Sequence, residues 1–353
     1  MDAFKEVSRG VAKIKQADYL PHGRHPIIDQ GKGMIAGYSN AEEGLFTDVP
    51  AIVFGDHTRC VKYVSESFFA GADGVKILKP LLSDNVRYWY HALRSVRLDN
   101  LGYSRHYKLL KQTTFAYVDE DIQSAVCDVL DSILAAANLA RCQLPLLDGL
   151  VKSRFIEMFG KDRYPIVAIG DVSTDIRYGT SKKASENGRY IYLRMNNLTD
   201  DGRLDLSDIK RIDLTESELE KCLVEKGDLL FNRTNSREKV GKTAVFDLDE
   251  PMVIAGYIIR VRLQPEVNSV YLSTFMNLEK TKALLQAIAK GAVHQANINA
   301  QQLAAIEFPL PPLPLQQQFA SFVAEVDKSR VVVQQQIEKL QTLYDSLAQD
   351  YFG

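Results

Sequence analysis

Apolar residues recur at alternating steps of four and three along two stretches of the chain. One seam runs from Val126 to Met158 and the other from Phe319 to Tyr351, and each position of the second lies 193 residues after its counterpart in the first. A strict heptad seam of this length predicts two long helices that pair along their apolar stripes. The positions that we expect in the contact are Val126, Leu130, Ile133, Leu144, Leu147, Val151, Phe319, Val323, Val326, Val333, Ile337, Leu340 and Leu347.

Each seam also contains one arginine, Arg154 or Arg330, and the first helix contains Pro145. A proline inside a helix removes one backbone donor and clashes with the preceding turn, so we expect a kink or a break near Arg141. The alternative is that both stretches are ordinary core helices of one globular domain. We favour pairing, because a globular helix seldom keeps a 3.5-residue period over so many turns.

The two segments outside the seams, 1–118 and 161–313, contain short β-type runs bounded by glycine, proline, asparagine and aspartate. This pattern predicts strand-rich segments, with a helix over 85–95 in the first and over about 269–290 in the second. The segments also share residues in order. At an offset of 185, Ala70-Gly71, Leu78 and Pro80 fall on Ala255-Gly256, Leu263 and Pro265, and at 193 Gln123 falls on Gln316.

These repeats predict an α+β fold built by tandem duplication of a mixed α/β, strand-rich domain followed by a long helix. The expected boundaries along the chain are 1–118 and 161–313 for the strand-rich domains, and 119–160 and 314–353 for the helices. A chain of 353 residues has room for two or three domains.

Composition is that of a soluble protein, with 46% hydrophobic and 25% charged residues. The N-terminal segment lacks a secretory signal pattern, and no apolar run reaches the length of a membrane helix, so we expect a cytoplasmic protein without a membrane partner. The four cysteines show no metal-ligand spacing. Net charge is −2, but the two helices carry −4 and −2, which leaves +4 on the strand-rich segments and permits nucleic-acid binding.

Eight short stretches resemble one protein family: Ile27–Gly31, Ile52–Arg59, Gly71–Gly74, Tyr178–Ser181, Leu193–Asn197, Gly227–Ser236, Val240–Ala244 and Pro309–Pro312. The chain is similar, over essentially its whole length, to the specificity subunits of type I restriction-modification systems. The resemblance implies two target-recognition domains joined by spacer helices that form an antiparallel coiled coil. It also implies that each domain reads one half of a bipartite DNA site, while the helices set the spacer and dock the methyltransferase subunits.

Loops rich in cationic, amide and hydroxyl side chains are those that contact phosphates and base edges. A solvated surface loop is the alternative for each such cluster, but clusters recur at equivalent places in both halves. We therefore expect DNA contacts from His57, Thr58, Arg59, Ser104, Arg105, His106, Tyr178, Thr180, Ser181, Lys182, Lys183, Arg194, Arg233, Thr234, Asn235, Ser236, Arg237, Lys239, Lys242, His294, Gln295 and Asn297.

Motifs of catalysis are missing from the sequence. There is no nucleophile elbow, no P-loop, no methyl-donor motif, and the six histidines lack metal-ligand spacing. We expect no catalytic residue, metal or cofactor in this chain. The resemblance implies that the chemistry belongs to partner subunits: two modification subunits with S-adenosylmethionine, and a motor-nuclease subunit with ATP and Mg²⁺.

A protein of another class also fits the pattern. A coiled-coil adaptor that presents two strand-rich lobes to protein partners, without binding DNA, would suit the slightly negative net charge. Salt dependence separates the two hypotheses, because a protein that neutralises DNA phosphates loses affinity steeply as the salt concentration rises.

Overall fold

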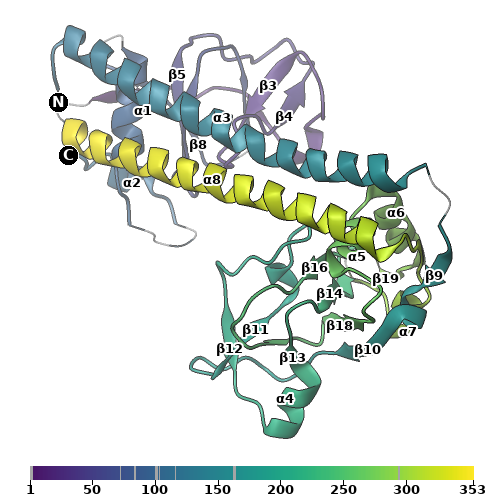
Figure 1. Cartoon of the computed structure of the whole chain (residues 1–353). Coiled ribbons are helices and arrows are strands. Elements are labelled where there is room, and N and C mark those ends of the chain that lie inside the picture. The colour runs from purple at the N-terminus through teal and green to yellow at the C-terminus, as the bar shows by residue number, and fades with distance from the viewer. Residues whose placement is uncertain are drawn as a thin grey trace. The chain divides into compact units, whose positions relative to one another are not determined.

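The computed structural model describes residues 3–71, 73–82, 85–99, 102, 104–115, 117–161, 164–292 and 295–353. They form two compact units, one of Met1–Arg141 with Gln334–Gly353 and the other of Cys142–Val333. Each unit combines one strand-rich lobe with one half of each long helix (Figure 1).

The described residues of the first lobe form two four-stranded sheets. One has the antiparallel order β1-β8-β5-β6, and the other has the order β2-β7-β3-β4, in which β7 is parallel to both neighbours. The elements are β1 (Phe4–Glu6), β2 (Lys13–Ile14), η1 (Gln16–Asp18), β3 (His25–Ile28), β4 (Gly37–Ser39), β5 (Ala51–Gly55), β6 (Val61–Val64), β7 (Phe69–Gly71), β8 (Val75–Pro80), α1 (Val86–Ser95) and α2 (Tyr107–Leu110).

The second lobe repeats this arrangement and adds small sheets. Its larger sheets have the orders β10-β18-β14-β16, all antiparallel, and β12-β11-β17-β13, in which β11 and β17 are parallel. The elements are β9 (Ile166–Ala168), η2 (Ile169–Val172), β10 (Ser173–Tyr178), β11 (Tyr190–Leu193), η3 (Met195–Asn197), β12 (Lys210–Ile212), α4 (Glu216–Cys222), β13 (Leu223–Val224), β14 (Leu229–Asn232), β15 (Thr234–Asn235), β16 (Thr243–Val245), β17 (Met252–Ile254), β18 (Ile258–Leu263), α5 (Ser269–Met276), α6 (Glu279–Ile288), β19 (Lys290–Ala292), β20 (Gln295–Asn297), α7 (Ala300–Ala304) and β21 (Glu307–Pro309).

The shared topology of the lobes confirms the duplication. Strands β8, β5 and β6 correspond to β18, β14 and β16, and the parallel pair β3-β7 corresponds to β11-β17. Helix α1 follows β8 as α5 follows β18, and the side chains of Asn85 and Asn268 cap the two helices. An N-cap asparagine satisfies backbone donors that the first helical turn leaves unpaired.

The predicted offset between the halves is only partly correct. It is 185 at Ala70 and Ala255, which make corresponding parallel bridges. One strand later, the sheet register makes Leu78 equivalent to Val261, an offset of 183. The predicted matches at Leu78 and Pro80 are therefore wrong, because the first lobe has two more residues than the second between the parallel bridge and this sheet position.

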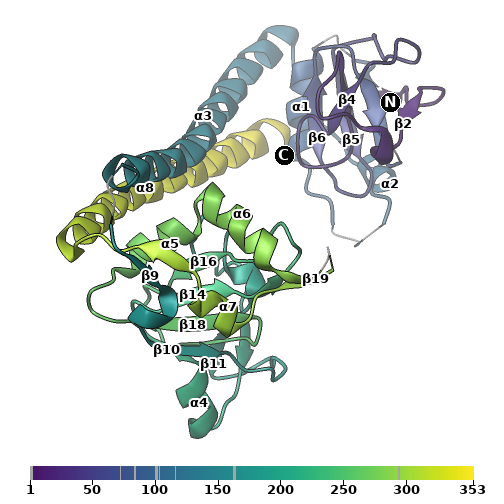
Figure 2. The same ribbon diagram turned by 90° about the vertical axis from the view of Figure 1, so that its right-hand side faces the viewer.

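The two long helices are α3 (Glu120–Phe159) and α8 (Leu313–Phe352), and the antiparallel pairing is confirmed. In the first unit the N-terminal half of α3 shares a core with the C-terminal half of α8, and in the second unit the opposite halves do so. Both views show the helices side by side (Figures 1 and 2). Helix α3 continues through Pro145 without interruption, so the predicted break does not occur.

Seam positions that pack against a lobe are more buried than those in the middle of the helices. Positions such as Leu130 and Phe319 are fully buried, whereas Leu144, Leu147, Ile337 and Leu340 are half-buried because only one partner helix covers them. At the C-terminal end of each helix, the buried positions change to steps of four. The residues there are Val151, Phe155 and Phe159 in α3 and Tyr344, Ala348 and Phe352 in α8.

The arginine of the second seam lies in an ion network. Arg330 is 7% exposed; its guanidinium pairs with Asp148 of α3 and donates to the Leu144 carbonyl at 3.3 Å. Arg203 of the second lobe pairs with Asp148 at 3.0 Å and with Asp327 of α8 at 2.8 Å. A buried charge is tolerated only when it is paired, so this network fixes the helices against the second lobe.

By length and composition alone, α3 is apolar enough to cross a membrane, and only a minority of its most apolar stretch is buried. One such helix is weak evidence of a membrane span. Because one face of α3 packs against α8, the remaining apolar residues form a second, uncovered face of a coiled-coil helix.

Candidate nucleic-acid interface

Four loops of the second lobe meet at one edge of its sheets. β11 and β17 are parallel neighbours, so the loops that follow them leave the sheet at the same edge. The loop after β14 joins them through the Arg233 N–H, which donates to the Tyr257 carbonyl at 2.9 Å. The Gly256 N–H donates to the Thr180 carbonyl at 2.7 Å and holds the loop after β10. The loops are 179–183, 194–197, 233–236 and 255–257.

Arg233 lies at the centre of this edge. Its guanidinium carbon lies 4.7 Å from the centroid of the Tyr178 ring, and Nη1 donates to the Gly256 carbonyl at 3.5 Å. The Tyr178 hydroxyl accepts from the Ala300 N–H at 2.8 Å, which fixes the ring under the arginine. The Arg233 Nε is buried and finds no acceptor among the described residues. A stacked guanidinium with unused donors is suited to an anionic or base-edge ligand.

The third predicted cluster lies beside Arg233. Strand β15 pairs with β20, and the Thr234 hydroxyl donates to the Asn297 side-chain oxygen at 3.1 Å. Gln295 of β20 is exposed. His294 lies outside the described residues. Two segments that are separated by about sixty residues in the sequence thus form one surface with Tyr178.

Two other predicted residues are held by acidic neighbours. The Lys182 ammonium lies 2.7 Å from the Glu218 carboxylate, and with Thr215 it lowers the pKa of Glu218 to about 2. Arg194 pairs with Asp208 at 2.9 Å. These cations are partly neutralised within the protein, so their attraction for phosphate is reduced.

The side chains of Arg237 and Lys242 bond to other groups of the second lobe. The Arg237 guanidinium donates to the carbonyls of Gln286 and Gly291, at 2.8 and 3.1 Å. Lys242 is 8% exposed and pairs with Asp200 at 3.1 Å. Both side chains tie loops of the lobe together. We correct the assignment of Lys242 as a DNA contact because it is buried, whereas Arg237 is half-buried and remains a candidate.

The other predicted residues of this lobe remain candidates. Ser181, Lys183 and Lys239 are exposed, and Thr180, Asn235 and Ser236 are half-buried.

Two residues that the sequence did not single out belong to the same edge. Tyr257 is 51% exposed between β17 and β18, and Met195 is 39% exposed in η3. Large exposed apolar side chains beside unpaired donors are typical of a binding surface. Tyr257 was missed because it lies within an apolar run that indicates a buried strand.

In the first lobe, Gln30 joins the loops that follow β3, β5 and β7, which correspond to the loops after β11, β14 and β17 in the second lobe. Its side chain donates to the Asp73 carbonyl at 3.1 Å and accepts from the His57 N–H at 3.2 Å, and its carbonyl accepts from the Thr58 hydroxyl. Gly74 has a φ of +88°, and a Cβ atom there would lie 2.6 Å from the Gln30 side-chain oxygen. Glycine is therefore required for this close approach.

The predicted contacts of the first lobe divide into surface and core. His57 lies at the edge, with Nδ1 3.2 Å from the Ser104 carbonyl, and Arg105 is exposed. His106 is fully buried, and its Nδ1 lies 3.0 Å from the Asp56 carbonyl. His106 cannot reach a ligand on the surface, so its assignment as a DNA contact is wrong.

These features define a class of protein: a duplicated pair of lobes, each with a polar loop edge, carried on an antiparallel helix pair. Comparison with known proteins identifies the family. A family model described as "Type I restriction modification DNA specificity domain" matches residues 162–342. The chain belongs to this family.

Two relatives carry the same description. The chain is 30% identical over 175 residues to the putative type I restriction enzyme MjaX specificity subunit of Methanocaldococcus jannaschii, covering 48% of this chain and 41% of that protein. It is 23% identical over 248 residues to the type I restriction enzyme EcoKI specificity subunit of Escherichia coli K12, covering 64% and 53%. The matches thus span about half the length of these relatives.

Solved structures share the fold over nearly the whole chain. The S subunit of the type I restriction-modification system from M. genitalium superposes with a TM-score of 0.53 at 12% identity, covering 99% of this chain and 94% of that one. A chain from a structure of type I restriction-modification complex assembly gives a TM-score of 0.53 at 13% identity, covering 99% and 97%. At these identities the likeness supports the fold alone.

Proposed function

We propose that this protein is the DNA-recognition subunit of a type I restriction-modification enzyme. Each lobe reads one half of a bipartite site, and the length of the helix pair sets the spacer between the halves. The lobes carry different residues on equivalent loops, so the two half-sites differ in sequence.

The observation that carries this proposal is the loop edge of the second lobe. Arg233 stacks on Tyr178, and its Nη2 group bonds to no described residue, next to Thr234, Asn297 and Gln295. Arginine, asparagine and glutamine are the side chains that form paired hydrogen bonds with guanine and adenine edges. The family membership of the chain supports the same function.

The outer face of α3 is the docking surface that we assign to the modification subunits. It exposes large apolar side chains that the partner helix leaves uncovered: Ile122, Val129, Leu139, Leu146, Leu150 and Ile156. Exposed apolar surface of this extent is characteristic of a protein–protein contact. We propose two modification subunits, one on each half of the duplicated chain, together with a motor-nuclease subunit.

The chain itself is not catalytic in this proposal. S-adenosylmethionine, ATP and Mg²⁺ are held by the partner subunits, and the assembled enzyme acts on DNA in the cytoplasm. The relatives named above are specificity subunits of restriction enzymes, which supports a division of labour between recognition and chemistry.

Mapping methylated adenines tests the proposal. Cells that express this chain with its modification subunits should carry methyl groups at one asymmetric, two-part sequence, and cells without the chain should lose them. Binding of the assembled complex to that sequence should weaken steeply as salt rises. A complex that binds DNA without salt dependence, or methylation that is unchanged without this chain, would support the coiled-coil adaptor instead.

A further inference from the structure

Arg59 adopts a backbone conformation that arginine rarely takes. Its φ is +61°, and it is the only non-glycine residue with a positive φ in the described part of the chain. It lies in the turn between β5 and β6, next to His57 and Thr58. In the left-handed region the Cβ atom crowds the backbone, and glycine would relieve this strain. A strained residue in a loop indicates a role for its side chain.

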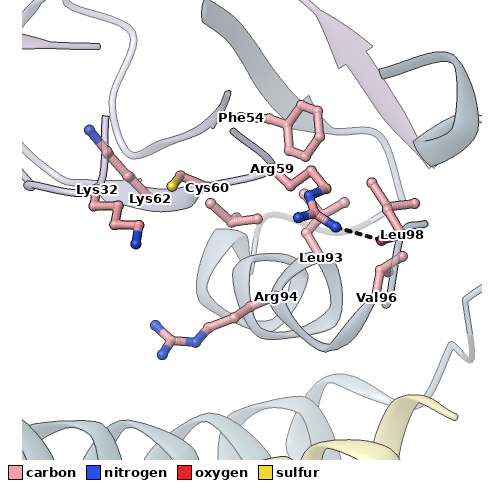
Figure 3. A pocket seen from close by; sticks show the side chains of 10 residues that line it. Lys32, Phe54, Arg59, Cys60, Lys62, Leu93, Arg94, Val96 and Leu98 are labelled. Carbon is pink, nitrogen blue, oxygen red and sulfur yellow. Dashed lines mark hydrogen bonds between the residues drawn. The ribbon is translucent and has the colours of Figure 1, made fainter. Parts of the chain in front are cut away.

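The Arg59 side chain lines a cavity of about 260 Å³ in the first lobe (Figure 3). One wall is apolar and comes from β5, β6, α1 and the segment after α1: Phe54, Val61, Leu93, Val96 and Leu98. The other lining residues are Lys32, Arg59, Cys60, Lys62 and Arg94. Four of these ten residues are cations, and none of them is an acid.

Two of the four cations are already engaged. The Lys62 ammonium donates to the Asp29 carbonyl at 2.7 Å, and Figure 3 shows it turned away from Arg59. Arg94 donates to the Tyr90 hydroxyl at 2.9 Å, and its guanidinium carbon lies 4.9 Å from the centroid of the Tyr344 ring.

The other two cations keep donors for a ligand. Arg59 Nη1 donates to the Leu98 carbonyl at 2.8 Å, and the remaining side-chain N–H groups of Arg59 bond to nothing in the ranges that the structure covers. Lys32 is exposed and makes no ion pair with a described residue.

From this arrangement we infer that the cavity binds a phosphate ester that carries a sugar. Arg59 and Lys32 hold the phosphate, and Leu93, Val96 and Leu98 pack against the sugar. Guanidinium and ammonium groups are the usual phosphate donors, and an apolar wall matches the carbon face of a ribose ring.

The source of the phosphate ester that we assign is the backbone of DNA bound at the first half-site, so this inference rests on the proposed function. The turn after β5, which holds Arg59, corresponds to the loop after β14, which holds Arg233. Lys32 lies in the loop after β3, which Gln30 ties to the same edge. The cavity therefore opens beside the predicted reading loops, where a free nucleotide is the other possible source.

Alkylation of Cys60 reports occupancy of the cavity. Cys60 lines it, Cys127 and Cys222 are buried, and Cys142 is exposed on α3. The full chain with Cys142→Ser is assembled with its modification subunits and treated with iodoacetamide. Duplex DNA carrying the recognised sequence should slow alkylation by about tenfold or more, whereas inorganic phosphate and thymidine 5′-monophosphate should protect only at millimolar concentration.

The three probes separate the sources. Protection by thymidine 5′-monophosphate at micromolar concentration, without protection by duplex DNA, would show that the cavity takes a free nucleotide and would overturn the DNA assignment. Equal alkylation rates with and without every probe would overturn the cavity site altogether.

Arg59→Gly provides an independent test that is insensitive to misfolding. Glycine relieves the strain of the positive φ, which offsets the lost bond to Leu98 and the greater entropy of the unfolded chain, so the variant should unfold at about the same denaturant concentration as wild type. Its affinity for the recognised duplex should fall about tenfold, and the slope of log K against log salt should become shallower by about one, with the recognised sequence unchanged. Lys79→Ala, whose ammonium pairs with Asp48 outside the cavity, is the matched control.

Wild-type affinity and slope in Arg59→Gly would overturn the inference. The proposed function would survive that result if Arg233→Ala still lost binding. If Arg59→Gly and Arg233→Ala both bind DNA as wild type does, the result would count against the inference and against the proposed function.

Discussion

Gln123 and Gln316 lie 193 residues apart and form the same hydrogen bond in the two units. Each side chain is fully buried near the start of its long helix, and each donates to the carbonyl five residues earlier, at Val118 and Pro311, both at 2.8 Å. This bond fixes the direction in which the chain enters each helix. The pair is the clearest trace of the duplication, because a buried glutamine is costly unless its bonds are made.

Gln316→Leu is predicted to destabilise the protein by about 3 kcal/mol. Gln316 donates to the carbonyls of Pro311 and Glu266 and accepts from the Asn268 N–H at 2.8 Å, so leucine would remove all three bonds and leave the buried Pro311 carbonyl without this partner. Gln317→Leu, at the exposed neighbouring position, should change the free energy of unfolding by less than about 0.5 kcal/mol. Urea denaturation of both variants measures the difference, and equal midpoints would contradict the prediction.

The long helices were predictable because a heptad seam is a local signal. Even so, the heptad pattern does not hold at the C-terminal ends, where Phe155 and Phe352 are buried in place of the expected Arg154 and Tyr351. There each helix packs against a lobe as well as against its partner, and this contact cannot be seen in the periodicity.

Sheet order and the break between α5 and α6 were not predictable from local pattern. One helix was predicted over 269–290, but the structure has two. Asn277 ends α5, where its side chain donates to the Thr243 and Ser273 carbonyls at 2.7 and 2.9 Å. The bond to Thr243 comes from a residue 34 positions away, so no local signal reports it.

The donor-rich loops could be found from the sequence, because loop composition is a local signal, but the sequence did not predict that several of them meet around Arg233. The sequence did not show which of these donors form hydrogen bonds or ion pairs within the protein itself. Arg237, Lys242 and His106 were chosen for their chemistry, and the structure uses all three to hold loops together. Such contacts depend on long-range packing.

Arg233→Ala is predicted to relax the sequence preference of the second lobe. Loss of a bidentate contact costs about 1–3 kcal/mol of discrimination, so affinity for the preferred half-site should fall about tenfold or more while non-specific binding changes little. Tyr178→Phe keeps the ring beneath the guanidinium and should have a smaller effect. Binding to a panel of half-site variants measures both. Arg189→Ala, at the opposite end of β11, is the control, and an unchanged preference in Arg233→Ala would contradict the contact.

Lys183 and Lys182 are neighbours, but Lys183 is predicted to contribute more to DNA binding than Lys182. Lys183 is exposed, so Lys183→Ala should weaken binding to all duplexes and make the slope of log K against log salt shallower by about one. Lys182 is paired with Glu218, so Lys182→Ala should have less effect. Glu218→Gln should free Lys182 and strengthen non-specific binding. Equal losses in the two alanine variants would show that the pair with Glu218 opens when DNA binds.

Lys282 is predicted to make stability depend on pH above neutrality. Its ammonium donates to the Gly241 carbonyl at 3.2 Å. Burial lowers the pKa of Lys282 to about 8; Asp200 opposes this effect, and Lys242 and Lys152 add to it. Between that value and the ordinary lysine pKa of about 10.4, the unfolded chain binds more protons than the folded protein. The contribution of Lys282 to stability should therefore rise with pH across this window.

Lys282→Met tests the effect. The variant should be more stable than wild type at pH 7, and the difference should shrink as pH rises from about 8 towards 10. Lys280 is exposed on the same helix, so the difference in unfolding free energy between Lys280→Met and wild type should stay constant across this pH range. Urea midpoints at several pH values give both comparisons, and a gap that does not change with pH in Lys282→Met would contradict the prediction.

The length of the helix pair is predicted to set the spacer of the DNA site. Deleting 135–141 from α3 and 334–340 from α8 removes one heptad from each helix and keeps the seams in register. Seven residues correspond to about 10 Å of helix, or about three base pairs. The methylated sequence should keep both half-sites and change only its spacer. Deleting the heptad from α3 alone would misalign the seams and should prevent assembly. An unaltered spacer in a folded, active double deletion would mean that the helices hold the lobes without measuring the distance between half-sites.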